Sequence, residues 1–136
     1  QVVAGTTSTK INFNNPELTN YTLFNVARYV GTNRQRIVQS NDHAQLFGFW
    51  NGLSGVSYHG GWVTQYATTV HNDNWVLSTD YALNYRSNGT SRGASGGVNY
   101  LSPIGINWDG TQTGDFQIAE VLILKTILQI AMDLRM

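Results

Sequence analysis

Three short runs in the second half of the chain most constrain its fold. Residues 75–80 read Trp-Val-Leu-Ser-Thr-Asp, an alternating run that breaks at an acidic residue. Residues 82–90 form a second run that ends on the turn pair Asn88-Gly89, and residues 115–124 form a long apolar run interrupted by Glu120. Short runs separated by turn residues are typical of β-strands. The first two runs therefore predict an antiparallel hairpin, and residues 116–124 predict a central strand.

In the first half of the chain, short runs also alternate with turn residues. The clearest run covers residues 21–30, which are rich in the aromatic and β-branched side chains that favour strands. Turn signals recur roughly every 8–12 residues, a spacing typical of a sandwich or barrel. Only the C-terminal tail looks helical, because its apolar residues fall at i, i+3, i+4 and i+7: Ile127, Ile130, Ala131 and Leu134.

The order of the motifs resembles that of the laminin-G-like modules of the concanavalin A-like lectin/glucanase superfamily. The matching motifs are the Trp75–Asp80 run, the strand that ends in Asn88-Gly89, and the late Ile118-Ala119-Glu120-Val121 strand before a short helix. The resemblance implies an all-β, two-sheet jelly-roll sandwich with a short C-terminal helix. It implies one domain over residues 1–136, either alone or as a module of a larger protein, with a glycan- or protein-binding role.

Charge and composition exclude several classes of partner. Eight basic and eight acidic residues give a formal net charge of zero, whereas nucleic-acid binding needs a basic surface. No run of about 18 apolar residues is present, so we expect no membrane span. Cysteine is absent, which excludes disulfides, zinc–thiolate sites and thiol catalysis.

The carboxylates do not suggest an enzyme. Glycoside hydrolases need two carboxylates that face each other across the scissile bond, but the only glutamates are Glu17 and Glu120, far apart in sequence. Five of the six aspartates are expected in turns: Asp42, Asp73, Asp80, Asp109 and Asp115. The one G-x-S-x-G match, residues 93–97, lies in a stretch expected to be a glycine-rich loop and not a strand-to-helix nucleophile elbow. The three histidines lack metal-ligand spacing. We therefore expect a protein without catalytic activity.

A calcium site is conceivable in the loop between Asp109 and Asp115. This loop is polar and has a carboxylate at each end, and calcium prefers six to eight oxygen ligands that include carboxylates. Superfamily relatives often hold one calcium at the edge of the sandwich. The alternative is that these aspartates only form turns, which is their commonest structural role.

Aromatic and amide side chains favour a carbohydrate site. Sugars present apolar C–H faces and hydroxyls, so they bind to aromatic rings flanked by planar hydrogen-bonding groups. The chosen candidates are Trp50, Asn51, His59 and Trp62, and glycines beside them allow a ligand to approach closely. His59 and Trp62 flank the Gly60-Gly61 turn and are expected to be exposed together. The alternative for Trp50 is the core, where Trp75 is also expected.

Two N-x-S/T sequons, at Asn20 and Asn88, are compatible with secretion and N-linked glycosylation.

We therefore expect a non-catalytic extracellular module that binds carbohydrate. The alternative is a structural subunit or repeat module of an extracellular assembly or filament. In that case the tail would contact copies of the chain or neighbouring modules, because Leu128 and Met136 add apolar residues beyond one helical stripe.

Overall fold

The computed structural model of the chain describes residues 1–66, 71–108 and 110–125. Within these ranges it contains strands and no helix. The strands are β1 (Val3–Gly5), β2 (Ile11–Asn12), β3 (Thr22–Tyr29), β4 (Val38–Ser40), β5 (Gln45–Trp50), β6 (Leu53–His59), β7 (Val76–Tyr81), β8 (Asn84–Ser87), β9 (Thr90–Gly93), β10 (Ile104–Ile106) and β11 (Phe116–Leu124). The predicted C-terminal helix falls in residues 126–136, outside the described residues.

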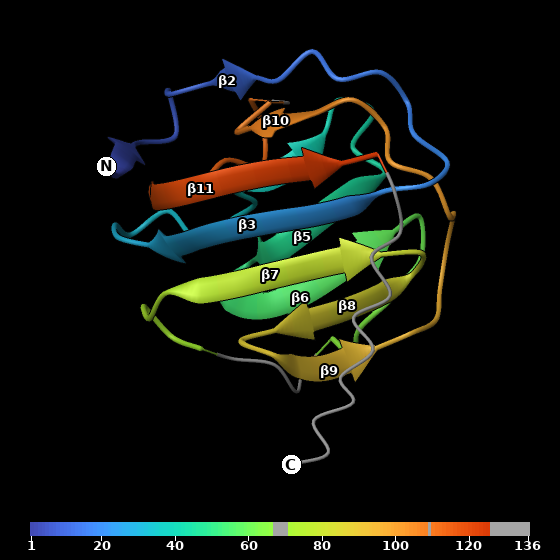
Figure 1. Cartoon of the computed structure of the whole chain (residues 1–136). Helices are drawn as coiled ribbons and strands as arrows, with labels where there is room; N and C mark the ends of the chain where they lie inside the picture. The colour runs from blue at the N-terminus through green and yellow to red at the C-terminus, as the bar shows by residue number, and fades with distance from the viewer. Residues whose placement is uncertain (67–70, 109, 126–136) are drawn as a thin grey trace.

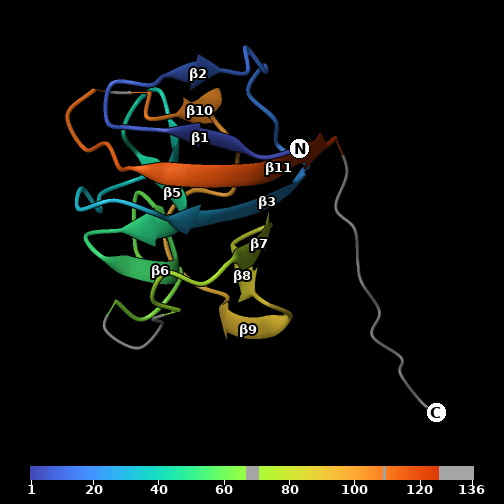
Figure 2. The same cartoon turned by 90° about the vertical axis from the view of Figure 1, so that its left-hand side faces the viewer.

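The strands form two antiparallel sheets packed face to face, so the all-β sandwich prediction is confirmed. The six-stranded sheet has the order β1-β11-β3-β7-β8-β9, and the five-stranded sheet has the order β2-β10-β4-β5-β6. Figure 1 looks onto the six-stranded sheet, with the five-stranded sheet behind it. Figure 2 shows the two layers from the side.

The strands predicted in the second half are present in the predicted pairing. β7 pairs antiparallel with β8, and β11 lies between β1 and β3 as a central strand. β8 and β9 are joined by Asn88-Gly89, both at positive φ (48° and 78°), as a two-residue hairpin turn requires. A bulge between Ile118 and Glu120 interrupts β11, and Glu120 is exposed to solvent, where its charge stays hydrated.

The core lies between the sheets and is built from alternate residues of both. Tyr29 of β3 meets Phe49 of β5 edge to face, with ring centroids 5.1 Å apart, and so links the two layers. The buried core residues are Tyr21, Leu23, Ala27, Tyr29, Ile37, Val38, Phe47, Phe49, Val76, Leu101, Ile104, Ile106, Phe116 and Ile118. Full burial of each large apolar side chain contributes about 1.5–3 kcal/mol.

Two expectations about single residues were wrong. Trp75 is not in the core: it is partly exposed, and the guanidinium of Arg28 lies 5.0 Å from its ring centroid, within cation–π range. Asp80 is not a turn residue: it is fully buried within β7. β7 extends one residue further than its alternation suggested, and the turn falls at Ala82 and Leu83, both at positive φ.

Candidate functional site

The outer face of the five-stranded sheet carries an aromatic surface. Tyr58 of β6 is paired with Leu46 of β5 on one side and with Trp62 on the other. Residues directly opposite each other in an antiparallel ladder share a face of the sheet. Since Phe47, the neighbour of Leu46, points into the core, Leu46, Tyr58 and Trp62 point away from it.

Four rings meet on this face, and we call them the aromatic cluster: Trp50, Tyr58, Trp62 and Tyr66. The centroid of Trp62 lies 5.5 Å from Trp50, 5.3 Å from Tyr58 and 5.2 Å from Tyr66, and Trp50 and Tyr66 are 5.2 Å apart. These edge-to-face and tilted contacts fix the rings against one another. All four are partly exposed, and Tyr66 is 42% exposed. The cluster is therefore an ordered apolar surface in contact with water.

A glycine turn brings Trp62 back beside Tyr58. The N–H of His59 donates to the carbonyl of Gly61 at 2.8 Å, which closes the turn. The turn packs tightly against Gly97, where a Cβ would lie only 1.5 Å from the carbonyl oxygen of His59. Gly97 also has φ +68°, so both its conformation and its contact require glycine. The local sequence thus positions the ring of Trp62 through backbone packing.

Polar side chains border the aromatic cluster. A pocket of about 280 Å³ is lined by Arg36, His43, Leu46, Trp50, Tyr58, Trp62 and Gln112. The guanidinium of Arg36 donates to the carbonyl of His43 at 2.8 Å, and the backbone N–H of Arg36 donates to the carbonyl of Gln112 at 3.2 Å. These bonds hold together the loops that contribute the polar residues. The result is an apolar surface beside planar hydrogen-bonding groups, the combination that small-molecule sites use.

The structure brings two of the four candidate ligand residues together. Trp50 and Trp62 are in contact, and both line the pocket. Asn51 lies in the β5–β6 turn, is exposed, and accepts a hydrogen bond from the side chain of Gln35 at 3.4 Å, so it flanks Trp50 without lining the pocket. His59 must be corrected: its side chain is buried between the sheets and cannot reach a ligand on the outer face.

His59 belongs instead to a buried polar network centred on Asp80. The carboxylate of Asp80 accepts hydrogen bonds from Tyr21 at 2.8 Å and Ser57 at 2.7 Å, and lies 3.0 Å from Nε2 of His59. Burial alone lowers the pKa of His59, but the charge of Asp80 and hydrogen bonds with Asp80 and Val98 outweigh it, and the net pKa is raised. Ser57 donates to the carboxylate of Asp80, so this hydrogen bond does not pair the hydroxyl with the imidazole of His59 in the way that a Ser–His nucleophile requires.

Only one of the two proposed calcium ligands, Asp115, lies within the described residues. Asp109 lies outside the described residues. The carboxylate of Asp115 accepts hydrogen bonds from the backbone N–H groups of Thr7 and Asn33 and from the Asn33 side chain, at 3.1–3.2 Å. These bonds lower the pKa of Asp115 and use its two oxygens to fasten neighbouring loops. In the part of the chain that is described, no three acidic, histidine or cysteine side chains are grouped to hold a metal ion.

Both sequons lie at exposed asparagines. Asn20 precedes β3, and Asn88 forms the tip of the β8–β9 hairpin. The side chain of Asn88 also makes two hydrogen bonds to the backbone near the start of β7. Its Oδ1 accepts from the N–H of Leu77 at 2.8 Å, and its Nδ2 donates to the carbonyl of Trp75, just before the strand, at 3.4 Å. Asn88 therefore has a structural role in addition to its place in a sequon.

Several residues of the site were not expected from the sequence. Tyr66 and the three polar residues of the pocket, Arg36, His43 and Gln112, come from loops that carry no recognisable motif. One signal was available: Tyr58 and Trp62 flank a Gly-Gly turn at four residues' distance, which suits two residues facing each other across a tight turn. The rest depends on how distant loops pack.

Compared with protein-family models, with curated proteins and with solved structures, the chain matches none of them. Among the described residues, no helix has the length and apolar character needed to cross a membrane.

Proposed function

We propose that the protein is a non-catalytic, extracellular, lectin-like module that binds carbohydrate at the aromatic cluster. The observation that carries this proposal is the contact of four partly exposed rings beside a pocket bordered by Arg36 and Gln112. Ring faces pack against the C–H faces of a pyranose, and planar amide and guanidinium groups bond its hydroxyls. Trp62 is the central ring, because it contacts the other three.

The sandwich supports a finer assignment within the same proposal. Two packed antiparallel sheets of six and five strands are compatible with a jelly-roll of the concanavalin A-like superfamily, and with the resemblance to laminin-G-like modules. Exposed sequons at Asn20 and Asn88 agree with a secreted glycoprotein. A calcium ion involving Asp115 remains part of this proposal; it would have to replace the loop contacts that Asp115 makes.

A glycan array tests the proposed function. Wild-type protein should retain a defined subset of printed glycans, and Trp62→Ala should lose them, with a loss of about 1–3 kcal/mol of binding free energy for each ligand titrated. Trp75→Ala is the matched control, because Trp75 is also a partly exposed tryptophan but lies outside the site. An array on which wild type and Trp62→Ala behave alike would remove the proposal.

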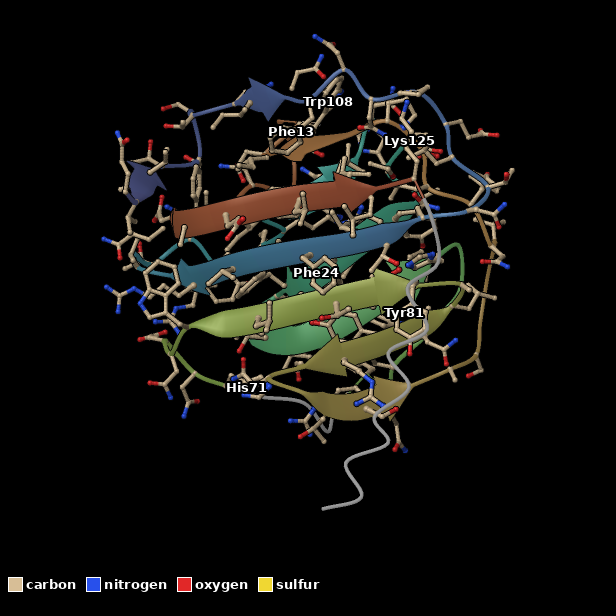
Figure 3. All side chains as sticks on the ribbon, viewed as in Figure 1. Phe13, Phe24, His71, Tyr81, Trp108 and Lys125 are labelled. Carbon is tan, nitrogen blue, oxygen red and sulfur yellow. The ribbon has the colours of Figure 1, made fainter. Side chains whose placement is uncertain are left out.

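The outer face of the six-stranded sheet favours a second candidate function, a structural subunit of an assembly. Leu122 of β11 is paired with Phe24 of β3, and Val26 with Leu77 of β7, so these apolar side chains share one face. Leu77 and Leu122 are 41% and 42% exposed, and Figure 3 shows Phe24 projecting from this face. Exposed apolar patches of this kind commonly mark interfaces.

For this second candidate we propose that neighbouring copies meet through this face and through the tail that follows β11. Native mass by light scattering should show an assembly for wild type. Leu77→Ser with Leu122→Ser should shift it to the monomer, and so should Leu128→Ser with Met136→Ser. A wild-type monomer at high concentration, or an assembly that survives both double variants, would remove the structural-subunit candidate.

A further inference from the structure

The row of residues beneath the aromatic cluster continues across the whole five-stranded sheet. Leu46 is paired with Gln39 of β4, and Gln39 with Gly105 of β10. Gly105 in turn is paired with Asn12 of β2. Because direct partners in an antiparallel ladder share a face, the row that includes Tyr58 and Trp62 follows the outer side of the sheet from one edge to the other. Its middle residues, Gln39 and Leu46, are fully buried beneath neighbouring groups.

A second tryptophan lies on this row, at the opposite end from the aromatic cluster. A Cβ placed on Gly105 would be 2.3 Å from Cε3 of Trp108. Ile104 and Ile106 on either side point into the core, so the missing Cβ of Gly105 points outward and the indole rests directly on the strand. Trp108 is partly exposed and lines a pocket of about 250 Å³ with Lys10, Ile11 and Asn12. Figure 3 shows Trp108 at this edge of the molecule.

The chain around Trp108 is held by a buried side chain. Asn107 is fully buried, and its Nδ2 donates to the carbonyls of Gly114 at 2.9 Å and Thr6 at 3.0 Å. Its Oδ1 accepts from the N–H of Gly114 at 3.0 Å. These bonds close the loop that begins at Trp108, so the indole is positioned before any ligand arrives. Such preorganisation lowers the entropic cost of binding.

The distance between the two aromatic positions indicates the size of the ligand. Three strand spacings separate Gly105 on β10 from Tyr58 on β6, which is about 14 Å at the usual spacing of strands. A single sugar ring cannot contact both ends, but an extended oligosaccharide can. We propose that the outer face binds an oligosaccharide laid across the strands, with Trp108 as a second stacking platform. This inference rests on the proposed carbohydrate-binding function.

Titration with sugars of increasing length tests this inference. The probes are the one- to six-unit series of β-1,4-linked glucose and of β-1,4-linked N-acetylglucosamine. Wild-type affinity for the bound series should rise with length. Trp108→Ala should leave the shortest bound member unaffected and weaken the longest about tenfold, the effect of losing one aromatic stack. Trp108→Phe should restore most of the loss, whereas Trp62→Ala should weaken every length.

The outcomes separate this inference from the proposed function. If Trp62→Ala abolishes binding while Trp108→Ala keeps the affinity for long chains, the second platform is wrong and the function stands. If wild type binds neither series, the oligosaccharide inference is overturned, and the glycan array decides the function independently. Should Trp108→Ala fail to fold, the indole N–H signal of Trp108 in wild type gives the answer: it should shift with the longest sugar and not with the shortest.

Discussion

Nε2 of His59 lies 3.0 Å from Oδ2 of Asp80, and this contact joins β6 of one sheet to β7 of the other. The two side chains are 0% and 1% exposed. A buried pair of opposite charges is sensitive to the loss of either partner, because the remaining charge has no water to solvate it. The packing of the two sheets around Asp80 therefore depends on whether His59 is protonated.

Stability should fall as pH rises above 6.5 through the raised pKa of His59. That pKa is raised above its ordinary value of 6.5, so the folded state holds a proton that the unfolded state releases. The contribution is complete below pH 6.5 and is lost as pH rises through the folded pKa. Urea unfolding between pH 5.5 and 9 measures the trend, and His59→Gln should remove it.

His71 supplies the control for this pH dependence. Burial and Arg92 lower the pKa of His71, so its contribution has the opposite sign: it is present above pH 6.5 and lost as pH falls through the lowered folded pKa. In a His71→Gln background the decline at higher pH due to His59 should remain. A stability profile that is the same in His59→Gln and wild type would contradict the charged His59–Asp80 pair.

Asp80→Asn should destabilise the fold by about 3–5 kcal/mol, the cost of breaking a buried ion pair and leaving one charge behind. Asp73→Asn is the matched control. Asp73 pairs with Arg34 at 2.7 Å on the surface, where an ion pair contributes about 0–1 kcal/mol. Chemical denaturation of both variants compares the two sites. Equal effects would mean that the Asp80 network is not a determinant of stability.

Leu83→Gly should raise the free energy of unfolding by about 1 kcal/mol. Leu83 has φ 62°, and this left-handed conformation costs a residue with a side chain roughly 1–2 kcal/mol. Glycine avoids this strain, but its more flexible unfolded state offsets part of the gain in stability. Gly89→Ala is the reverse experiment in the next hairpin turn. Gly89 has φ +78° and no neighbour that a Cβ would meet, so alanine should destabilise through the backbone alone. Thermal melts of the two variants should move in opposite directions.

Asn88 should carry an N-linked glycan when the protein passes through a eukaryotic secretory route, because the hairpin tip is exposed. Intact mass detects the glycan. Thr90→Ala removes the sequon while it keeps the hydrogen bonds of Asn88, and should remove the added mass. Secreted protein with the mass of the bare polypeptide would contradict the expectation.

Local patterns made the strands predictable but not every turn. Short-range sequence patterns predicted the strand β7 and the turn at Asn88-Gly89 after β8. Ala82 and Leu83 carry no turn signal, yet they form the turn between β7 and β8 at φ 45° and 62°. Pairing of the flanking strands imposes this conformation. The turn expected from the sequence was therefore too early in the chain and wrongly included Asp80.

The contacts of the site depend on residues distant in sequence. Asp80 looked like a turn residue because its partners Ser57 and Tyr21 lie 23 and 59 positions away, and only the packing of the two sheets brings them together. Trp50 and Trp62 could be selected by residue type, since exposed tryptophan is chemically distinctive. Their mutual contact, and the burial of His59 one position beyond Tyr58, follow from strand register, which the sequence does not display.

The four tryptophans of the chain allow the most direct test of the binding face. Each gives one indole N–H signal, and NMR titration with a glycan retained on the array reports on all four at once. The signals of Trp50 and Trp62 should shift with any bound sugar, and that of Trp108 with a long one. Trp75, stacked beneath Arg28 outside the site, should not move. A ligand that binds and shifts Trp75 while Trp50 and Trp62 stay unchanged would contradict a carbohydrate site on the outer face of the five-stranded sheet.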